Sequence, residues 1–504
     1  MKVAAARWLL AGVATLLGAC ASIDAPGVPP GTDATITACA RWFEQLDVSV
    51  EQAGVRDAQA ERIAGFAGLR IDRIGAAQRE RAGADSAAFE AWLARLQQLD
   101  DAGLAVEIAN LPHTAFPLAA VADPAAARAR SSSCTAAWGA PLRADAALRA
   151  RLLARAEVPD RYAAWQRAAG LYPLVRWPFF AGVQRWQQRQ RALIEHWSMA
   201  PPPTQRYVPA GAAPSAAAVA GLWRERPRDA LGLPRFTPDE LATLLAAHAP
   251  ALEVETRAGF DRYGALEWRA GRVPAVDADT PVLYQRVTAT RYRGVWLLQL
   301  VYSLWFPERP AQDHFDLLAG ALDAVVLRIT LAPDDGRPLL VDTIHGCGCY
   351  PLYFPTPDAT LRANAPAGDE WAYAPARLPA LRPGERVTVR LASATHYVVG
   401  VARDEGAPGR PYALRDEDTL RTLPTPQGTT RSVFGPDGLV AGSERAERFF
   451  FWPMGIASAG AMRQWGHHAT AFVGRSHFDD ADLIERRFVI PSLDRQDAAN
   501  APGT

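Results

Sequence analysis

Lysine is almost absent from this chain of 504 residues: Lys2 is the only one, and every other basic residue is arginine. Beyond Lys2, the chain offers no lysine for a phosphate-binding P-loop, a Schiff base or a Ser-Lys nucleophile pair. ATP-driven and pyridoxal chemistry are therefore not expected. The sequence also contains no G-x-S-x-G nucleophile elbow, no H-E-x-x-H zinc motif and no C-x-x-C-H haem attachment.

An excess of either charge is also missing, since 54 Lys and Arg residues balance 54 Asp and Glu residues. Without a net basic field to attract phosphates, no nucleic-acid partner is expected. Hydrophobic residues make up 49% of the chain, which is ample for a large core. The length predicts about two or three domains.

The first residues form a pattern typical of a secretory signal. Two basic residues, Lys2 and Arg7, come before an apolar run, Trp8–Leu17. This run is shorter than the roughly 20 apolar residues that a bilayer-spanning helix needs. The run ends in Leu17-Gly18-Ala19-Cys20. This junction resembles the lipobox of bacterial lipoproteins; the alternative is an ordinary signal peptide with a chance cysteine.

The lipobox resemblance implies that residues 1–19 are a signal peptide and that Cys20 carries the lipid. Ala21 follows, where an Asp would favour the inner membrane in enterobacterial lipoproteins, so the resemblance implies the outer membrane and its periplasmic face. The partners expected there are the membrane, reached through the lipid, and an envelope protein or cell-wall component.

Four cysteines remain besides Cys20. Because the periplasm is oxidising, disulfides are expected. Cys39 and Cys134 bracket the first folded region, and a bridge between them would stabilise the fold by about 4–5 kcal/mol in the chain-entropy model. Pairings that involve Cys347 or Cys349 remain open at this point.

Composition and periodicity divide the chain into segments and predict an α+β protein: a mainly helical N-terminal region followed by a larger, antiparallel β-rich domain. After the signal peptide, the predicted segments are a tether (20–37), a mainly helical domain (38–200), a Pro/Ala-rich linker (201–230), the β-rich domain (231–492) and a disordered tail (493–504).

Alternating hydrophobic stretches joined by turn residues predict three pairs of strands. These are Val282–Thr290 with Val295–Phe306, Ala324–Leu331 with Pro338–Ile344, and Arg386–Leu391 with Thr395–Val401. Phe449-Phe450-Phe451-Trp452 is predicted as a buried strand. Aromatic residues also gather between Tyr172 and Trp197, where they indicate either core packing or a ligand surface.

The densest chemical segment is His345-Gly346-Cys347-Gly348-Cys349-Tyr350. If the preceding strand continues, His345, Cys347 and Cys349 share one face, and such donors suit a transition metal: zinc, copper or iron. Two alternatives stay open. The two cysteines could form a strained disulfide, or both could be small buried residues in a glycine-rich turn.

A second cluster contains His467, His468 and His477, which are further candidate metal ligands. Asp479 or Asp480 could orient one of these histidines, and hydrogen-bonded core histidines are the alternative. Together with the lipobox, segments 345–350 and 467–480 resemble a group of uncharacterised proteobacterial lipoproteins. This resemblance implies no activity.

Two hypotheses for function follow. The first is a lipid-anchored, non-catalytic binding or assembly module of the cell envelope. The alternative is a metal-dependent envelope hydrolase, in which metal-bound water attacks and Glu308 or Asp313 acts as a speculative base in a loop between strands. The two hypotheses predict different arrangements of these residues, because only the hydrolase requires both His/Cys clusters to lie in one pocket.

Overall fold

The computed structural model describes residues 34–119, 121–269, 271, 273–363 and 368–500. The predicted signal peptide and Cys20 lie outside these residues. The predicted tether overlaps the first helix, because α2 already begins at Ala34.

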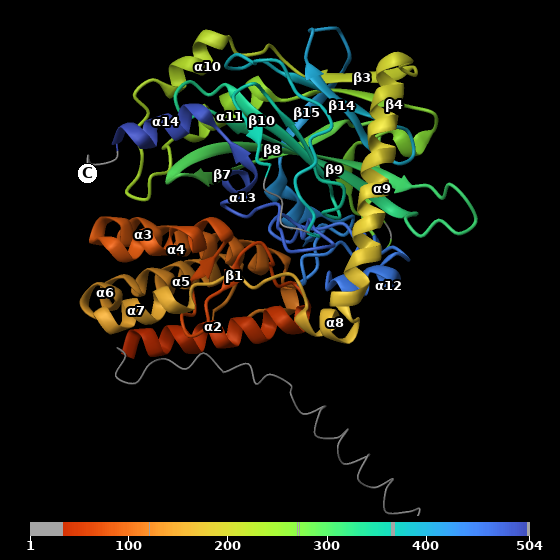
Figure 1. The fold of residues 1–504 in the computed structure, drawn as a ribbon. Helices are drawn as coiled ribbons and strands as arrows, with labels where there is room; N and C mark the ends of the chain where they lie inside the picture. The colour runs from red at the N-terminus through yellow and green to blue at the C-terminus, as the bar shows by residue number, and fades with distance from the viewer. Residues whose placement is uncertain (1–33, 120, 270, 272, 364–367, 501–504) are drawn as a thin grey trace, which may run out of the picture.

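The N-terminal part is helical, as predicted (Figure 1). Its helices are α2 (Ala34–Ala53), α3 (Arg73–Ala84), α4 (Ser86–Asn110), α5 (Pro124–Ala137), α6 (Gly139–Ala144), α7 (Ala146–Arg155), α8 (Ala164–Ala169) and α9 (Tyr172–Met199). Four begin after an aspartate, Asp72, Asp85, Asp123 or Asp145, whose carboxylate accepts a backbone N–H of the first turn. These caps satisfy donors that have no partner inside the helix.

The predicted disulfide is confirmed. Cys39 on α2 is bonded to Cys134 on α5, with a Cα–Cα distance of 5.2 Å. The bridge fastens α2 to the rest of the helical region at a point where Trp42 and Phe43 pack into the same core cluster.

The second half is built around one mixed sheet of ten strands, and the α+β prediction is confirmed. In spatial order the strands are β11 (Leu352–Pro355), β10 (Pro338–His345), β9 (Gly320–Leu331), β8 (Val295–Arg309), β7 (Val282–Tyr292), β15 (Arg410–Asp416), β3 (Thr204–Pro209), β4 (Ala251–Glu255), β13 (Val387–Leu391) and β14 (Val398–Arg403). Most pairs are antiparallel, but β13 runs parallel to β4, and β15 runs parallel to both β7 and β3 and so joins two halves of the sheet.

Short elements complete the fold. The remaining strands are β1 (Glu61–Arg62), β2 (Arg70–Ile71), β5 (Ala265–Glu267), β6 (Ala275–Asp277), β12 (Thr360–Leu361), β16 (Leu423–Pro424), β17 (Thr430–Arg431) and β18 (Phe488–Val489). The remaining helices are α10 (Ala216–Trp223), α11 (Pro238–His248), α12 (Arg448–Phe451), α13 (Leu483–Arg487) and α14 (Pro491–Asn500), with short 3-10 turns that include η3 (Glu417–Thr422) and η4 (Trp452–Met454). No helix of the described residues is long and apolar enough to cross a membrane.

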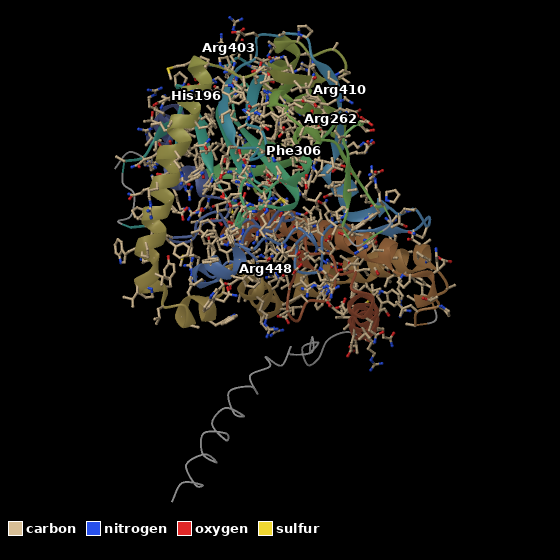
Figure 2. The ribbon with its side chains drawn as sticks, turned by 90° about the vertical axis from the view of Figure 1, so that its right-hand side faces the viewer. His196, Arg262, Phe306, Arg403, Arg410 and Arg448 are labelled. Atoms are coloured by element: carbon tan, nitrogen blue, oxygen red, sulfur yellow. A yellow bond between two sulfur atoms is a disulfide. The ribbon has the colours of Figure 1, made fainter. Side chains whose placement is uncertain are left out.

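Helix α9 belongs with the sheet rather than with the helical region to which it was assigned. It runs alongside the sheet, with its C-terminal end near His196 far from α8 and α12 (Figures 1 and 2). Gln190 on α9 donates to the carbonyl of Val398 on β14 at 2.6 Å, and Trp197 packs on Val399. The predicted boundary at residue 200 therefore separates a helix from the strands it covers.

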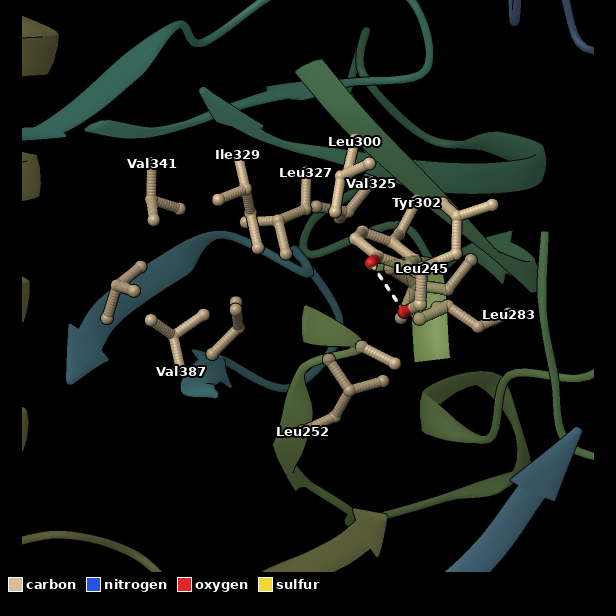
Figure 3. Close-up of a cluster of buried hydrophobic side chains, with 14 of the residues drawn as sticks. Leu245, Leu252, Leu283, Leu300, Tyr302, Val325, Leu327, Ile329, Val341 and Val387 are labelled. Carbon is tan, nitrogen blue, oxygen red and sulfur yellow. Dashed lines mark hydrogen bonds between the residues drawn. The ribbon is translucent and has the colours of Figure 1, made fainter. Parts of the chain in front are cut away.

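The main core lies inside the curved sheet, between strands from its two halves. In Figure 3, Leu327, Ile329 and Val341 face Leu252 and Val387. Helix α11 closes this core, since the hydroxyl of buried Tyr302 donates to the carbonyl of Leu245 at 2.8 Å (Figure 3).

The three predicted strand pairs are confirmed, with shifted ends. Between β7 and β8 the turn residues Arg293 and Gly294 both have positive φ angles, 45° and 77°. Such a two-residue turn matches the twist of the strands it joins.

Three other predictions are wrong. The predicted linker, 201–230, contains α10 and strand β3, which lies between β15 and β4 in the sheet. Residues 493–500 of the predicted disordered tail continue helix α14. The predicted buried strand at 449–452 is helix α12 and the start of η4, with Phe449 67% exposed, because these aromatic residues lie at the surface rather than in the core.

Candidate ligand-binding pocket

A cavity of about 450 Å³ lies between α9 and loops of the β-rich part, beside α12. Seven residues of α9 line it, five of them at helical spacing, and the loops bring further aromatic rings and two glutamates. Its aromatic lining consists of Phe179, Trp186, Tyr350, Trp371, Tyr373, Tyr397, Phe451 and Phe472. Most of the exposed lining is apolar, which is typical of a site for an organic ligand.

Trp186 is the central ring of one wall. Its ring centre lies 5.1 Å from that of Tyr350, 6.2 Å from Tyr373 and 6.5 Å from Tyr397. The indole Nε1 of Trp186 is buried and has no hydrogen-bond acceptor among the described residues. An unpaired buried donor is costly, so a ligand that carries an acceptor would satisfy it.

Glu370 is one of two buried carboxyl groups at the pocket. Burial raises its pKa to about 7, although it accepts backbone N–H groups from Phe472 at 2.7 Å and from Val473 at 2.8 Å. These two bonds hold the carboxyl group in place. They also fix the chain around Phe472, a ring that lines the same pocket.

Glu447 is the second buried carboxyl group at the pocket. Burial likewise raises its pKa to about 7, although Arg445 and Arg309 act to lower it. Its side chain passes close to Gly460, where a Cβ atom would stand 2.2 Å from Oε1 of Glu447. Gly460 also has a positive φ of 88°, so both backbone and space require glycine. Near neutral pH each pocket glutamate is therefore divided between its neutral and its charged form.

A buried polar network supports the tyrosines of the pocket from behind. Arg309 donates to the hydroxyl of Tyr397 at 3.3 Å, and the ring of His345 packs edge-on against Tyr350 and Tyr397. Nδ1 of His345 lies 3.6 Å from Oδ1 of Asp323.

Asp323 is the centre of that network, because Arg445 and His396 also contact its carboxylate, at 3.1 and 2.9 Å. Burial alone would raise the pKa of Asp323, but Arg445 and the hydrogen bonds from His345 and His396 hold it well below its usual range. Burial in turn lowers the pKa of His345. The network thus places a charged carboxylate and a neutral imidazole behind the pocket.

The first predicted metal cluster does not have the expected geometry. Strand β10 ends at His345, and the chain turns back so that the N–H of His345 donates to the carbonyl of Cys349 at 2.9 Å. Strand alternation therefore does not continue to Cys347 and Cys349. Both cysteines are buried free thiols, hydrogen-bonded to each other, which lowers the pKa of Cys347 and raises that of Cys349.

His467 and His477 have polar partners within the fold, whereas Nε2 of buried His468 has no hydrogen-bond partner among the described residues. His467 bonds to the carbonyl of Ala58 at 2.7 Å, and His468 packs near Trp465. Burial lowers the pKa of His467 to about 4 and that of His468 to about 3, so both are neutral.

His477 pairs with Ala469 in an antiparallel bridge, and its ring has Nε2 3.2 Å from Asp160 and Nδ1 3.4 Å from Asp480. Asp480 thus orients a histidine, as the sequence suggested, but this histidine makes structural contacts and belongs to no group of metal ligands among the described residues. Across the described ranges, no group of three or more His, Cys, Asp or Glu side chains could hold a metal ion. The two clusters therefore do not form the predicted joint site.

The speculative bases also lie away from the pocket. Strand β8 extends through Glu308, which is paired with Ala321 and exposed. Asp313 is exposed in the following loop, where its carboxylate accepts the N–H of Phe315 at 2.8 Å. Neither residue lines the cavity.

One signal for the pocket was present in the sequence. Phe179, Gly182, Val183, Trp186 and Gln187 follow the i, i+3, i+4, i+7, i+8 pattern of one helix face, and this face lines the cavity. The sequence offered a ligand surface here as one of two interpretations. Comparison of the chain with protein-family models, curated proteins and solved structures found no match.

Proposed function

We propose that this chain is a lipid-anchored binding module of the bacterial cell envelope, held through Cys20 at the periplasmic face of the outer membrane. In this proposal it is not an enzyme, and its aromatic pocket takes a small apolar ligand. The pocket is the observation that carries the proposal, because it combines a defined cavity, aromatic walls and few polar groups. The described residues gather no metal-ligand set, so the geometry favours binding over metal-dependent hydrolysis.

The polar groups of the pocket narrow the class of ligand. The pKa values of Glu370 and Glu447 are about 7, and Arg189 also lines the pocket, so the lining carries charges of both signs and favours neither a cationic nor an anionic ligand. The indole N–H of Trp186 needs an acceptor. We therefore expect an uncharged, largely apolar molecule that carries a hydroxyl, ester or amide oxygen.

A substitution that fills the pocket tests this proposal. Gly182 lies on the pocket face of α9, and a Cβ atom built there meets nothing within 4 Å. Gly182→Leu therefore adds a larger side chain on the pocket face with room for its Cβ atom, and leucine is a better helix former than glycine. Its neighbour Ala181 is exposed on the same helix, so Ala181→Leu is the matched control.

The probe is N-phenyl-1-naphthylamine, an uncharged dye that fluoresces in apolar sites. The protein is the chain from Ala21 onward, which retains every described residue. We expect saturable binding to the parent and to Ala181→Leu, and at least tenfold weaker binding to Gly182→Leu. Equal binding by all three proteins would contradict the proposal.

A further inference from the structure

Large hydrophobic side chains are exposed at one end of the molecule, where α8, the start of α9 and α12 lie together (Figure 1). The aromatic patch, as we call it, consists of Trp165, Leu171, Leu174, Trp177, Phe449 and Phe450, each at least 57% exposed. Single exposed hydrophobic residues are ordinary, but a gathering of this kind marks an interaction surface.

Direct contacts hold the elements of the patch together. The N–H of Ala163, just before α8, donates to the carbonyl of Gly455 at 2.7 Å, and Arg167 on α8 donates to the carbonyl of Met454 at 2.8 Å. Phe179 on α9 contacts Phe451 on α12, with ring centres 5.4 Å apart. The patch therefore rests on a fixed surface rather than on a loose segment.

Arginine is the only charged residue type in the two segments that form the patch. Residues 161–194, which include α8 and most of α9, contain six arginines and no acidic residue. Residues 448–478, which begin with α12, contain Arg448, Arg463 and Arg475 and likewise no acidic residue. Arg176 and Arg475 pair with Asp369 and Asp160 from neighbouring segments, and Arg167 and Arg463 are buried, whereas Arg185, Arg189 and Arg191 of α9 are exposed. Exposed Trp, Phe and Leu flanked by arginine match the chemistry of a bilayer interface with anionic lipids.

The position of the first helix, α2, agrees with an orientation in which the aromatic patch faces the bilayer. Helix α2 lies at the same end of the molecule as α8 in both views (Figures 1 and 2). It begins at Ala34, so an extended chain from Cys20 would reach roughly 50 Å at most. A lipid on Cys20 would hold this end near a membrane; this one step rests on the proposed anchor.

We infer that the aromatic patch docks on the surface of a bilayer that contains anionic phospholipid. Phe451 and Phe179 line the pocket; Phe451 directly follows Phe450 of the patch, and Phe179 lies two residues after Trp177. Docking would therefore bring one side of the pocket to the membrane surface. An apolar ligand could then pass between lipid and pocket with little exposure to water.

Vesicle flotation with the unlipidated chain from Ala21 onward tests the inference, because this protein has no anchor to hold it. The vesicles contain phosphatidylethanolamine with phosphatidylglycerol, or phosphatidylcholine alone. We expect the parent to float with the first kind and to be released as salt rises, since salt screens the arginines. Absence of parent binding to anionic vesicles would overturn the inference.

Leu174→Ser/Phe449→Ser/Phe450→Ser removes apolar area from the patch, and we expect at least a tenfold loss of vesicle binding. Met199→Ser is the control, because Met199 is highly exposed at the opposite end of α9 from the patch, and we expect no change. Equal vesicle binding by parent and patch variant would overturn the inference. So would a parent dimer, detected by analytical ultracentrifugation, that the patch substitutions dissociate, because the patch would then contact a second copy.

Two further measurements separate this result from that for the pocket. Gly182→Leu should float like the parent, and the patch variant should still bind N-phenyl-1-naphthylamine. Loss of dye binding in Gly182→Leu together with unchanged flotation of the patch variant would support the pocket and overturn the docking surface. The reverse result would support docking and overturn the pocket.

Discussion

At the scale of single residues, two glutamates reach the same pKa of about 7 in different surroundings. Glu370 is fixed by two backbone N–H donors, whereas Glu447 lies near the guanidinium groups of Arg445 and Arg309. In both, burial outweighs the groups that favour the charged form. The charge of the pocket therefore changes with pH near neutrality.

Glu447→Gln should change how stability depends on pH. Glu447 ionises near its ordinary pKa of 4.5 in the unfolded chain but near 7 in the folded chain. Between these values the folded state holds the extra proton, so the free energy of unfolding falls as pH rises toward 7. Glutamine removes this loss and should make the variant more stable than the parent above pH 7, by up to about 3 kcal/mol.

The measurement is urea unfolding of parent and variant at several pH values. The difference in stability should favour the variant increasingly from about pH 4.5 to 7 and then level off. A difference that does not change with pH would contradict the shifted pKa of Glu447.

At the scale of elements, what could be predicted depended on whether the signal was local. The hairpin β7–β8 could be predicted because alternating strands flank Arg293-Gly294. Strand β3 was missed because it is short, follows a proline run and pairs with β15, which lies about 200 residues further on.

The pocket was predictable only in part, for the same reason. Its wall on α9 follows a local helical spacing that the sequence displays. Glu370 and Glu447 come from loops far apart in the chain, and no local pattern joins them. Conversely, His345, Cys347 and Cys349 were predicted to share one face because strand alternation was extended past the residue at which β10 ends.

The disulfide between α2 and α5 allows a prediction at this scale. Cys39→Ser/Cys134→Ser removes a cross-link between residues 95 positions apart, which should lower the free energy of unfolding by about 4–5 kcal/mol in the chain-entropy model. Urea unfolding measures the loss. A reductant should lower the free energy of unfolding of the parent and leave that of the variant unchanged. A variant as stable as the parent would contradict the prediction.

At the scale of the whole molecule, a buried charge network ties the helical region to the sheet. Arg421 in η3 donates to both carboxylate oxygens of Asp57, at 3.0 and 2.7 Å. Arg70 lies beside the same aspartate and also binds Asp100 and Glu107. Because all five side chains are buried, breaking one pair leaves charge without compensation.

Asp57→Asn should therefore cost about 3 kcal/mol of stability, although the side chain keeps its size. Thermal unfolding measures the cost, and limited proteolysis should show earlier cleavage between the helical region and the sheet. The control is Glu157→Gln, which weakens an exposed pair with Arg79 and should change stability little. Similar melting temperatures for the two variants would contradict the prediction.

The proposed attachment to a membrane is also a property of the whole molecule. Cys20→Ser should abolish labelling of the protein by a fatty-acid probe in growing cells, because the thiol that would receive the lipid is gone. The protein should then leave the membrane fraction or retain its signal. Unchanged lipid labelling in the variant would contradict a lipid at Cys20.

Strand β15 has a consequence for the time at which this molecule can fold. It lies between β7 and β3, so the sheet cannot close until residue 416 has emerged. A chain exported from its N-terminus would first carry two partial sheets, each with an unpaired edge. Such edges can pair with the wrong strand. The risk of misassembly should therefore be highest just before β15 becomes available, and it should end when β15 pairs with β7 and β3.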